Sequence, residues 1–164
     1  MMMQPTVTPA PAQAQPLIER LYQLYLRDVT ASNEATDAPA GYAAPYLARY
    51  WHDPACVPFL LSCETQIVGF ALVGTNSRLH TTYDGHTCNA LFVLRHVRRQ
   101  GIGAAAAHTL FESFPGVWEI SSHAANTPGC TFWRATVDRF THGRYNEVWL
   151  QTTAWRGHVQ SFSS

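Results

Sequence analysis

The sequence has 164 residues, the length of a single domain, and a chain of this size buries about two thirds of its unfolded surface on folding. Eleven Lys and Arg residues balance eleven Asp and Glu residues, so the net charge is zero with neutral histidines. This balance excludes a general attraction to nucleic acid or to an anionic membrane surface. Any contact with an anion must therefore be local.

Cysteine and histidine spacing argues against a metal site. The four cysteines form no CxxC pair, and the eight histidines form no HExxH motif, so no zinc site is expected. No apolar run approaches the length of a membrane span, and no secretory segment precedes the domain. We therefore expect a cytoplasmic protein with reduced thiols and no membrane partner.

The first third of the chain is expected to contain a disordered N-terminal tail and two helices. Residues 1–15 are rich in Pro, Ala, Gln and Thr, which predicts a disordered segment ahead of a single domain over 16–164. Apolar residues at helical spacing then predict a helix over 16–29, and turn-forming residues predict a surface loop over 30–45. The aromatic cluster that follows suits a short helix over 46–51, and it forms either the edge of the core or an aromatic wall for a ligand.

The rest of the chain alternates strands and helices, which predicts an α/β fold. Two apolar runs joined by a short polar turn form a hairpin, and a third strand follows them. The succession of strand, helix and strand around residues 88–122 predicts a right-handed crossover, which makes those two strands parallel. The predicted strands lie at 56–63, 67–75, 87–94, 117–122, 145–153 and 156–162, and the predicted helices at 101–114 and 127–140.

A glycine turn joins the third strand to the next helix. Gly101 and Gly103 at the helix entrance leave backbone N–H groups uncovered, and a helix N-terminus concentrates partial positive charge there. Arg98 and Arg99 add full charges beside this entrance. The turn therefore predicts a site for a phosphate or a pyrophosphate.

Spacing separates the motifs that bind phosphate in this way. A P-loop is excluded because no lysine follows either glycine. A dinucleotide fingerprint fits residues 101–106, with Glu119 near the position of a ribose-binding acid. However, residues 95–100 separate the strand from its glycines, and too little chain follows residue 120 for the second half of such a fold.

A third motif, [QR]-x-x-G-x-[GA], matches Arg-Arg-Gln-Gly-Ile-Gly at 98–103. With Phe-Pro-Gly-Val-Trp-Glu-Ile at 114–120, Asn126 and Phe132-Trp133, the chain resembles the GCN5-related N-acetyltransferases, and a small bacterial subgroup of them in particular. The resemblance covers roughly residues 17–162. It implies a mixed, mostly antiparallel sheet flanked by helices, with two splayed parallel strands that form a cleft for acetyl-CoA.

The resemblance also implies which residues hold acetyl-CoA, the acetyl donor. The strand backbone at Leu91, Phe92 and Val93 would pair with the pantetheine arm, and Asn126 would contact the same arm. The turn would hold the pyrophosphate through backbone donors. Its residues are Arg98, Arg99, Gln100, Gly101, Ile102, Gly103 and Ala104.

Catalytic residues do not transfer from the family so simply. Positions that carry an acid or a base in many relatives are Ala90, Ser121 and Trp133 here, and none of these supplies an equivalent group. On an extended strand over 117–123, Glu119 and His123 project from the same face, so His123 could take the amine proton and Glu119 could orient it. Tyr145 is a further candidate acid.

Two functions follow from these residues. The first is an acetyl-CoA-dependent N-acetyltransferase whose acceptor is a small-molecule amine, such as an amino-acid-like metabolite or an antibiotic. The alternative is a noncatalytic CoA-binding or ligand-sensing module that kept the cofactor cradle and lost its acid and base. The sequence leaves open whether the protein is a monomer or a homodimer.

Overall fold

The computed structural model describes residues 3–31 and 43–164, and their strands form one seven-stranded sheet in the order β1-β2-β3-β4-β5-β7-β6. Neighbouring strands are antiparallel except β4 and β5, which are parallel. This arrangement confirms the predicted mixed α/β sheet and the crossover between its parallel strands. The strands are β1 (Thr6–Pro9), β2 (Val57–Cys63), β3 (Gln66–Gly74), β4 (His86–Val93), β5 (Val117–His123), β6 (Asn146–Gln151) and β7 (Arg156–Ser163).

Four α-helices flank the sheet in the described part of the chain, each close to its predicted position. They are α1 (Gln15–Ala31), α2 (Ala43–His52), α3 (Ile102–Ser113) and α4 (Thr127–Thr141). Two 3-10 turns, η1 (Ala12–Ala14) and η2 (Arg95–Val97), precede α1 and follow β4. Most of the loop predicted over 30–45 lies outside the described residues. No helix among those described has the length and apolar character needed to span a membrane.

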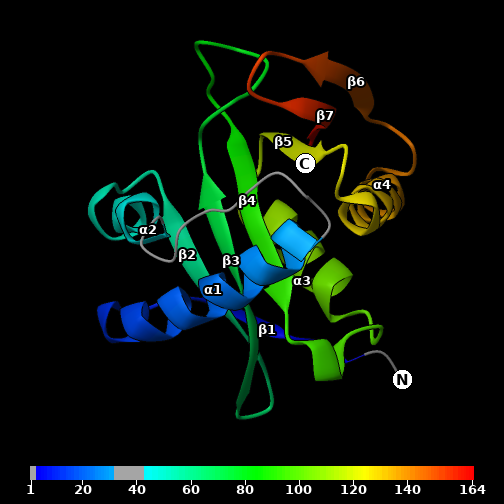
Figure 1. Ribbon diagram of the computed structural model, residues 1–164. Coiled ribbons are helices and arrows are strands. Elements are labelled where there is room, and N and C mark those ends of the chain that lie inside the picture. The colour runs from blue at the N-terminus through cyan, green and yellow to red at the C-terminus, as the bar shows by residue number, and fades with distance from the viewer. Residues whose placement is uncertain (1–2, 32–42) are drawn as a thin grey trace.

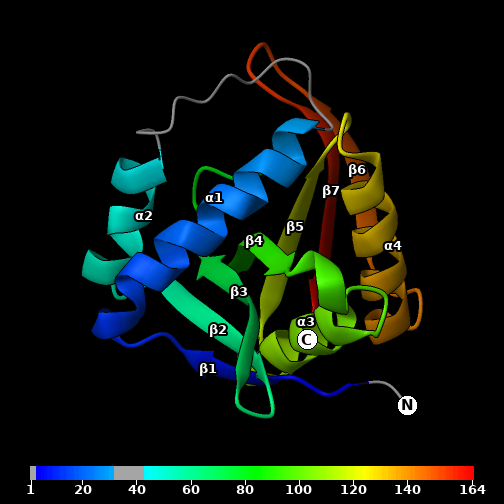
Figure 2. The same cartoon turned by 60° about the horizontal axis from the view of Figure 1, so that its bottom comes forward.

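The helices pack on both faces of the sheet because successive strand residues point to opposite sides. Along β3, Phe70 and Leu72 face α1 and α2, whereas Ala71 and Val73 face α3 and α4. In Figure 1, α1 runs across β3 and β4 in front of the sheet. In Figure 2, strands β5 and β7 lie between α1 and α4. The central strands β2 and β3 are thus buried on both sides, which explains their nearly continuous apolar sequences.

The N-terminal segment corrects the prediction of a disordered tail. Residues 6–9 form β1, which pairs antiparallel with residues 59–62 of β2, and Val7 packs against the core. Composition misled the prediction because so short a strand contributes little apolar area of its own. Its stability comes from a backbone ladder supplied by β2, a partner about fifty residues away in sequence.

The parallel strands β4 and β5 separate soon after they begin. Their register contains two pairs, His86 with Trp118 and Thr87 with Glu119. On its other side, β4 pairs with β3, and a register shift leaves Asn89 as an extra residue between Cys88 and Ala90. Such a bulge bends a strand and increases its twist. The two strands therefore splay, as the resemblance implied.

Candidate active site

The gap between β4 and β5 exposes a strand edge inside the molecule. Past Thr87, β4 has no strand partner among the described residues on the side toward β5, although its other edge remains paired with β3 as far as Val93. Side chains on this stretch still alternate, since Leu91 and Val93 pack toward α3 and Phe92 packs toward α1 and α2. The free edge offers backbone donors and acceptors to an extended ligand, in the manner of an added strand.

The glycine turn lies at the open end of this gap, between η2 and α3. Arg99 and Gly101 both have left-handed backbone conformations, with φ of 61° and 79°. Gly101 is the N-cap of α3 and supplies no side-chain cap, and the first turn of the helix contains no acidic residue. The N–H groups of that turn are therefore left for an external acceptor, at the positive end of the helix dipole.

Gly103 brings α3 close to α4 at this entrance. A Cβ atom built on Gly103 would lie 3.2 and 3.3 Å from two ring atoms of Phe132 and 3.7 Å from Cγ2 of Val93. Phe132 in turn packs edge to face on Trp133, with ring centroids 5.0 Å apart. The Phe-Trp pair singled out in the sequence thus forms a wall beside the turn. The cradle keeps its shape because residue 103 has no side chain.

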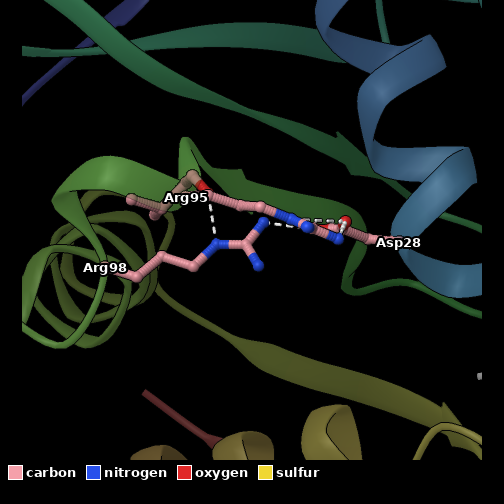
Figure 3. A network of polar contacts seen from close by, with 4 residues as sticks. Asp28, Arg95 and Arg98 are labelled. Carbon is pink, nitrogen blue, oxygen red and sulfur yellow. Dashed lines mark hydrogen bonds and ion pairs between the residues drawn. The ribbon is translucent and has the colours of Figure 1, made fainter.

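An ion-pair cluster ties the turn to α1 (Figure 3). Arg98 donates from Nε to the Val93 carbonyl at 2.7 Å and pairs with the carboxylate of Asp28, which Arg95 also contacts at 2.8 Å. Burial raises the pKa of Asp28, but the hydrogen bonds from Arg98 and Arg95 outweigh burial and lower it. One carboxylate is shared by two guanidinium groups, so a positive charge remains beside the turn, and the role of Arg98 at the anion site stays a prediction.

Asn126 lies where β5 ends and α4 begins. Its Oδ1 accepts a hydrogen bond from the Gly129 N–H at 3.1 Å, which caps the helix. A Cβ on Gly129 would lie 2.4 Å from Nδ2 of Asn126, so the capped conformation requires glycine there. The cap engages the side-chain oxygen of Asn126 and leaves its amide NH₂ as a donor, and the contact of this residue with the pantetheine arm stays a prediction.

Glu119 fastens the loop between β3 and β4 to β5. Its side chain is only 2% exposed, and its two oxygens accept hydrogen bonds from Ser77 Oγ at 2.5 Å and from the Arg78 N–H at 2.6 Å. Both of these hydrogen bonds go to the loop, and in the described part of the chain none joins Glu119 to His123. The geometry gives Glu119 a positioning role in the loop at 75–85, in contrast to its predicted partnership with His123.

His123 lies at the end of β5, on the face of the sheet that Glu119 also occupies. Its Nδ1 accepts a hydrogen bond from the Ala125 N–H at 3.1 Å, so the neutral ring carries its proton on Nε2. Burial, and then the positive charges of Arg156 and Arg78, lower the pKa of His123. The neutral ring therefore offers a hydrogen-bond donor at Nε2, and its role as the base for the amine stays a prediction.

Tyr145 lies away from these two residues. It packs, partly buried, against the cluster of α3, α4 and the sheet that contains Trp118 and Ile120. Those two β5 residues point to the face opposite Glu119 and His123. The structure therefore does not bring Tyr145 together with the other candidate catalytic side chains.

A polar cluster at the β4 bulge was missed by sequence reasoning. Asn89 donates from Nδ2 to the Tyr50 hydroxyl at 2.8 Å and to Asn76 Oδ1 at 3.0 Å, while its Oδ1 accepts from the Thr87 hydroxyl at 3.0 Å. Burial, followed by the neighbouring Tyr46, raises the pKa of Tyr50, which keeps its hydroxyl protonated. These uncharged groups lie next to Ala90, the position where relatives carry an acid.

Comparison with known proteins identifies the family. The sequence profile described as "Acetyltransferase (GNAT) family" matches residues 18–138, so the chain belongs to this family of acetyltransferases. No protein of curated function matches the sequence. The assignment therefore rests on the profile, and solved structures support the fold.

Solved structures with the same fold are distant in sequence. An acetyltransferase from Thermus thermophilus superposes with a TM-score of 0.72 at 13% identity, with 100% of both chains covered. A ribosomal-protein-alanine N-acetyltransferase from Brucella melitensis gives 0.67 at 16% identity, with 97% of this chain and 99% of that chain covered. A structure from Corynebacterium glutamicum, described as histone acetyltransferase HPA2 and related acetyltransferase, gives 0.73 at 14% identity, covering 97% and 96%. At these identities the likeness establishes the fold alone.

Proposed function

We propose that this protein is an acetyl-CoA-dependent N-acetyltransferase that transfers an acetyl group to the amine of a small molecule. The observation that carries the proposal is that two ligand-binding features, a strand edge and a helix N-terminus, follow one another along the chain. The unpaired edge of β4 leads directly to the uncapped entrance of α3, so one long ligand with an extended arm and a pyrophosphate can contact both. Family membership supplies the reaction class.

The residues present fit such a donor. The β4 backbone at 91–93 can pair with an extended amide-containing arm, and the N–H groups at 101–104 can hold a pyrophosphate because Gly103 leaves the cradle open. Asn126 can donate from its amide beside the arm. When bound, acetyl-CoA supplies an acetyl group activated as a thioester. Arg99, which is exposed and has no ion pair in the described part of the chain, adds positive charge to the cradle.

The side chains near this site offer hydrogen-bond donors more than proton-accepting bases. His123 can donate from Nε2 toward the end of the gap, and the Tyr50 and Asn89 groups at the bulge remain uncharged. We therefore propose that the acceptor amine is neutral when it attacks and that its surplus proton leaves to water. His123 would orient the reacting groups and assist the departure of the thiolate.

A free-thiol release assay with acetyl-CoA and a panel of amines tests this function. Calorimetry with CoA, carried out with and without excess NAD, measures the cradle separately. Turnover of at least one amine, together with CoA binding that NAD does not affect, supports the proposal. CoA binding without turnover of any amine would support the noncatalytic module, whose motivating observation is Ala90, Ser121 and Trp133 at the family's acid and base positions.

A further inference from the structure

Arg78 is held over an indole ring beside the candidate active site. Its guanidinium carbon lies 4.1 Å from the ring centroid of Trp155, which belongs to the connection between β6 and β7. A cation over the face of tryptophan at this distance gains a cation–π interaction. The contact does not consume the guanidinium N–H donors, so they remain for a hydrogen-bonding partner.

The backbone of Arg78 is fixed independently of its side chain. Glu119 accepts the Arg78 backbone N–H and the Ser77 hydroxyl, and Ser77 Oγ in turn accepts the N–H groups of Leu79 and His80. This loop also forms the lining of an open pocket at residues 75–81 and Tyr83. The position of Arg78 is therefore set by a buried carboxylate and an aromatic ring.

The guanidinium itself forms no ion pair with a carboxylate in the described part of the chain. Its neighbour Glu119 accepts a hydrogen bond from the Arg78 backbone N–H, and within residues 3–31 and 43–164 it accepts none from the Arg78 side chain. Burial lowers the pKa of Arg78, whereas the charge of Glu119 opposes that effect. Arginine remains charged in any case. The Arg78 guanidinium is partly desolvated and has unused N–H donors, so a carboxylate of a ligand can pair with it.

The position of Arg78 suits a ligand that reacts in the gap. Trp155 meets His123 edge to face, with ring centroids 6.0 Å apart, and Arg78 and Arg156 both act on the pKa of His123. Two arginine side chains, Arg78 and Arg156, therefore lie near the end of β5 on the face that His123 occupies. An acceptor with its amine near His123 would have an anionic group within reach of Arg78.

We propose that Arg78 binds the carboxylate of the acceptor and that the acceptor is consequently an amine bearing a carboxylate, of the amino-acid class. This inference rests on the proposed acetyltransferase function and narrows its substrate. Trp155 acts as a positioning residue that holds the guanidinium, and Glu119 positions the loop. A planar guanidinium can engage both oxygens of the carboxylate, which a lysine cannot do in the same geometry.

The test uses matched acceptors. The standard α-amino acids are compared with their carboxamides in the thiol-release assay, because the pair differs in charge and little in shape. For wild type we expect kcat/KM to favour the carboxylate by about tenfold to a hundredfold, the scale of a charge-assisted hydrogen bond. Arg78→Gln should abolish this preference for the carboxylate, Arg78→Lys should keep part of it, and Trp155→Leu should reduce it. Arg139→Gln, at an exposed arginine in the last turn of α4, is the control and should leave the ratio unchanged.

Each outcome decides between the proposals. Equal or better turnover of the carboxamides, or an Arg78→Gln protein with an unchanged ratio, would overturn the role of Arg78. The same holds if a protein that binds CoA turns over amines that lack a carboxylate but turns over no amino acid. Failure to bind CoA by calorimetry, or CoA binding without turnover of any amine in the panel, would instead overturn the acetyltransferase function on which this inference rests.

Discussion

Replacement of Gly103 by aspartate tests the anion cradle most directly. The new carboxylate would enter the first turn of α3, where the N–H groups are proposed to hold a pyrophosphate. Two unit charges about 4 Å apart repel by roughly 4 kcal/mol at an effective dielectric constant of about 20. This corresponds to a loss of CoA affinity on the order of a thousandfold. The expected result is that binding collapses.

The stability of the free protein should change in a different way. A negative charge in the first turn of a helix is favourable by about 0.3–1 kcal/mol, and replacing glycine inside a helix gains roughly a further 0.5 kcal/mol. Against this, the added Cβ lies 3.2 Å from the Phe132 ring, which must shift by a few tenths of an ångström. We therefore expect the thermal midpoint of Gly103→Asp to be close to that of wild type. A loss of binding would then not reflect unfolding.

Gly103→Asn is the matched control because its side chain has nearly the same size and no charge. Calorimetric titration with CoA, with circular dichroism as the folding check, should show a much smaller loss for asparagine than for aspartate. Equal losses in the two variants would mean that crowding against Phe132, and not charge, closes the cradle. A folded Gly103→Asp protein that binds CoA like wild type would refute the assignment of the turn.

Three further substitutions test other parts of the site. Arg99→Ala leaves the backbone donors in place and should weaken CoA binding by about 1 to 2 kcal/mol, measured by calorimetry; an unchanged affinity would remove Arg99 from the cradle. Asn126→Ala removes the N-cap of α4 and should lower the free energy of unfolding by about 0.5–2 kcal/mol in urea titrations, and an unaltered midpoint would contradict the cap. His123 has a lowered pKa in the folded state, so the unfolded chain binds more protons as the pH falls through about 6.5, and folding stability declines there. His123→Gln should show a smaller decline between pH 7.5 and pH 5 in the same titrations, whereas identical pH profiles would rule out this titration.

Local patterns in the sequence predict most of the elements. Continuous apolar runs mark β2 and β3, alternation with a period of two marks β7, and apolar residues with a period of 3.6 mark the buried face of α1. The crossover rule then orients β4 and β5 without knowledge of their contacts. β1 escapes such reasoning because its order depends on the edge of β2, which no pattern within residues 6–9 reveals.

The chemistry of the site is less predictable because its side chains meet across long stretches of sequence. Glu119 and Ser77 are 42 residues apart, Asn89 and Tyr50 are 39 apart, and Arg98 and Asp28 are 70 apart. A period-two rule correctly places Glu119 on the same side of β5 as His123. It gives no information about Ser77, whose hydroxyl donates a hydrogen bond to the Glu119 carboxylate. The glycine turn was predictable because all of its parts are adjacent in the chain.

The pairing of β1 with β2 has a consequence for the behaviour of shortened forms of the protein. A chain beginning at residue 16, the boundary that composition suggests, would leave the N–H and C=O groups of residues 59–62 without their strand. That edge is apolar and lies at the rim of a sheet, and exposed edges of this kind recruit strands from other molecules. Such a chain should therefore form concentration-dependent aggregates, because the segment at 6–9 acts as a built-in block against sheet extension.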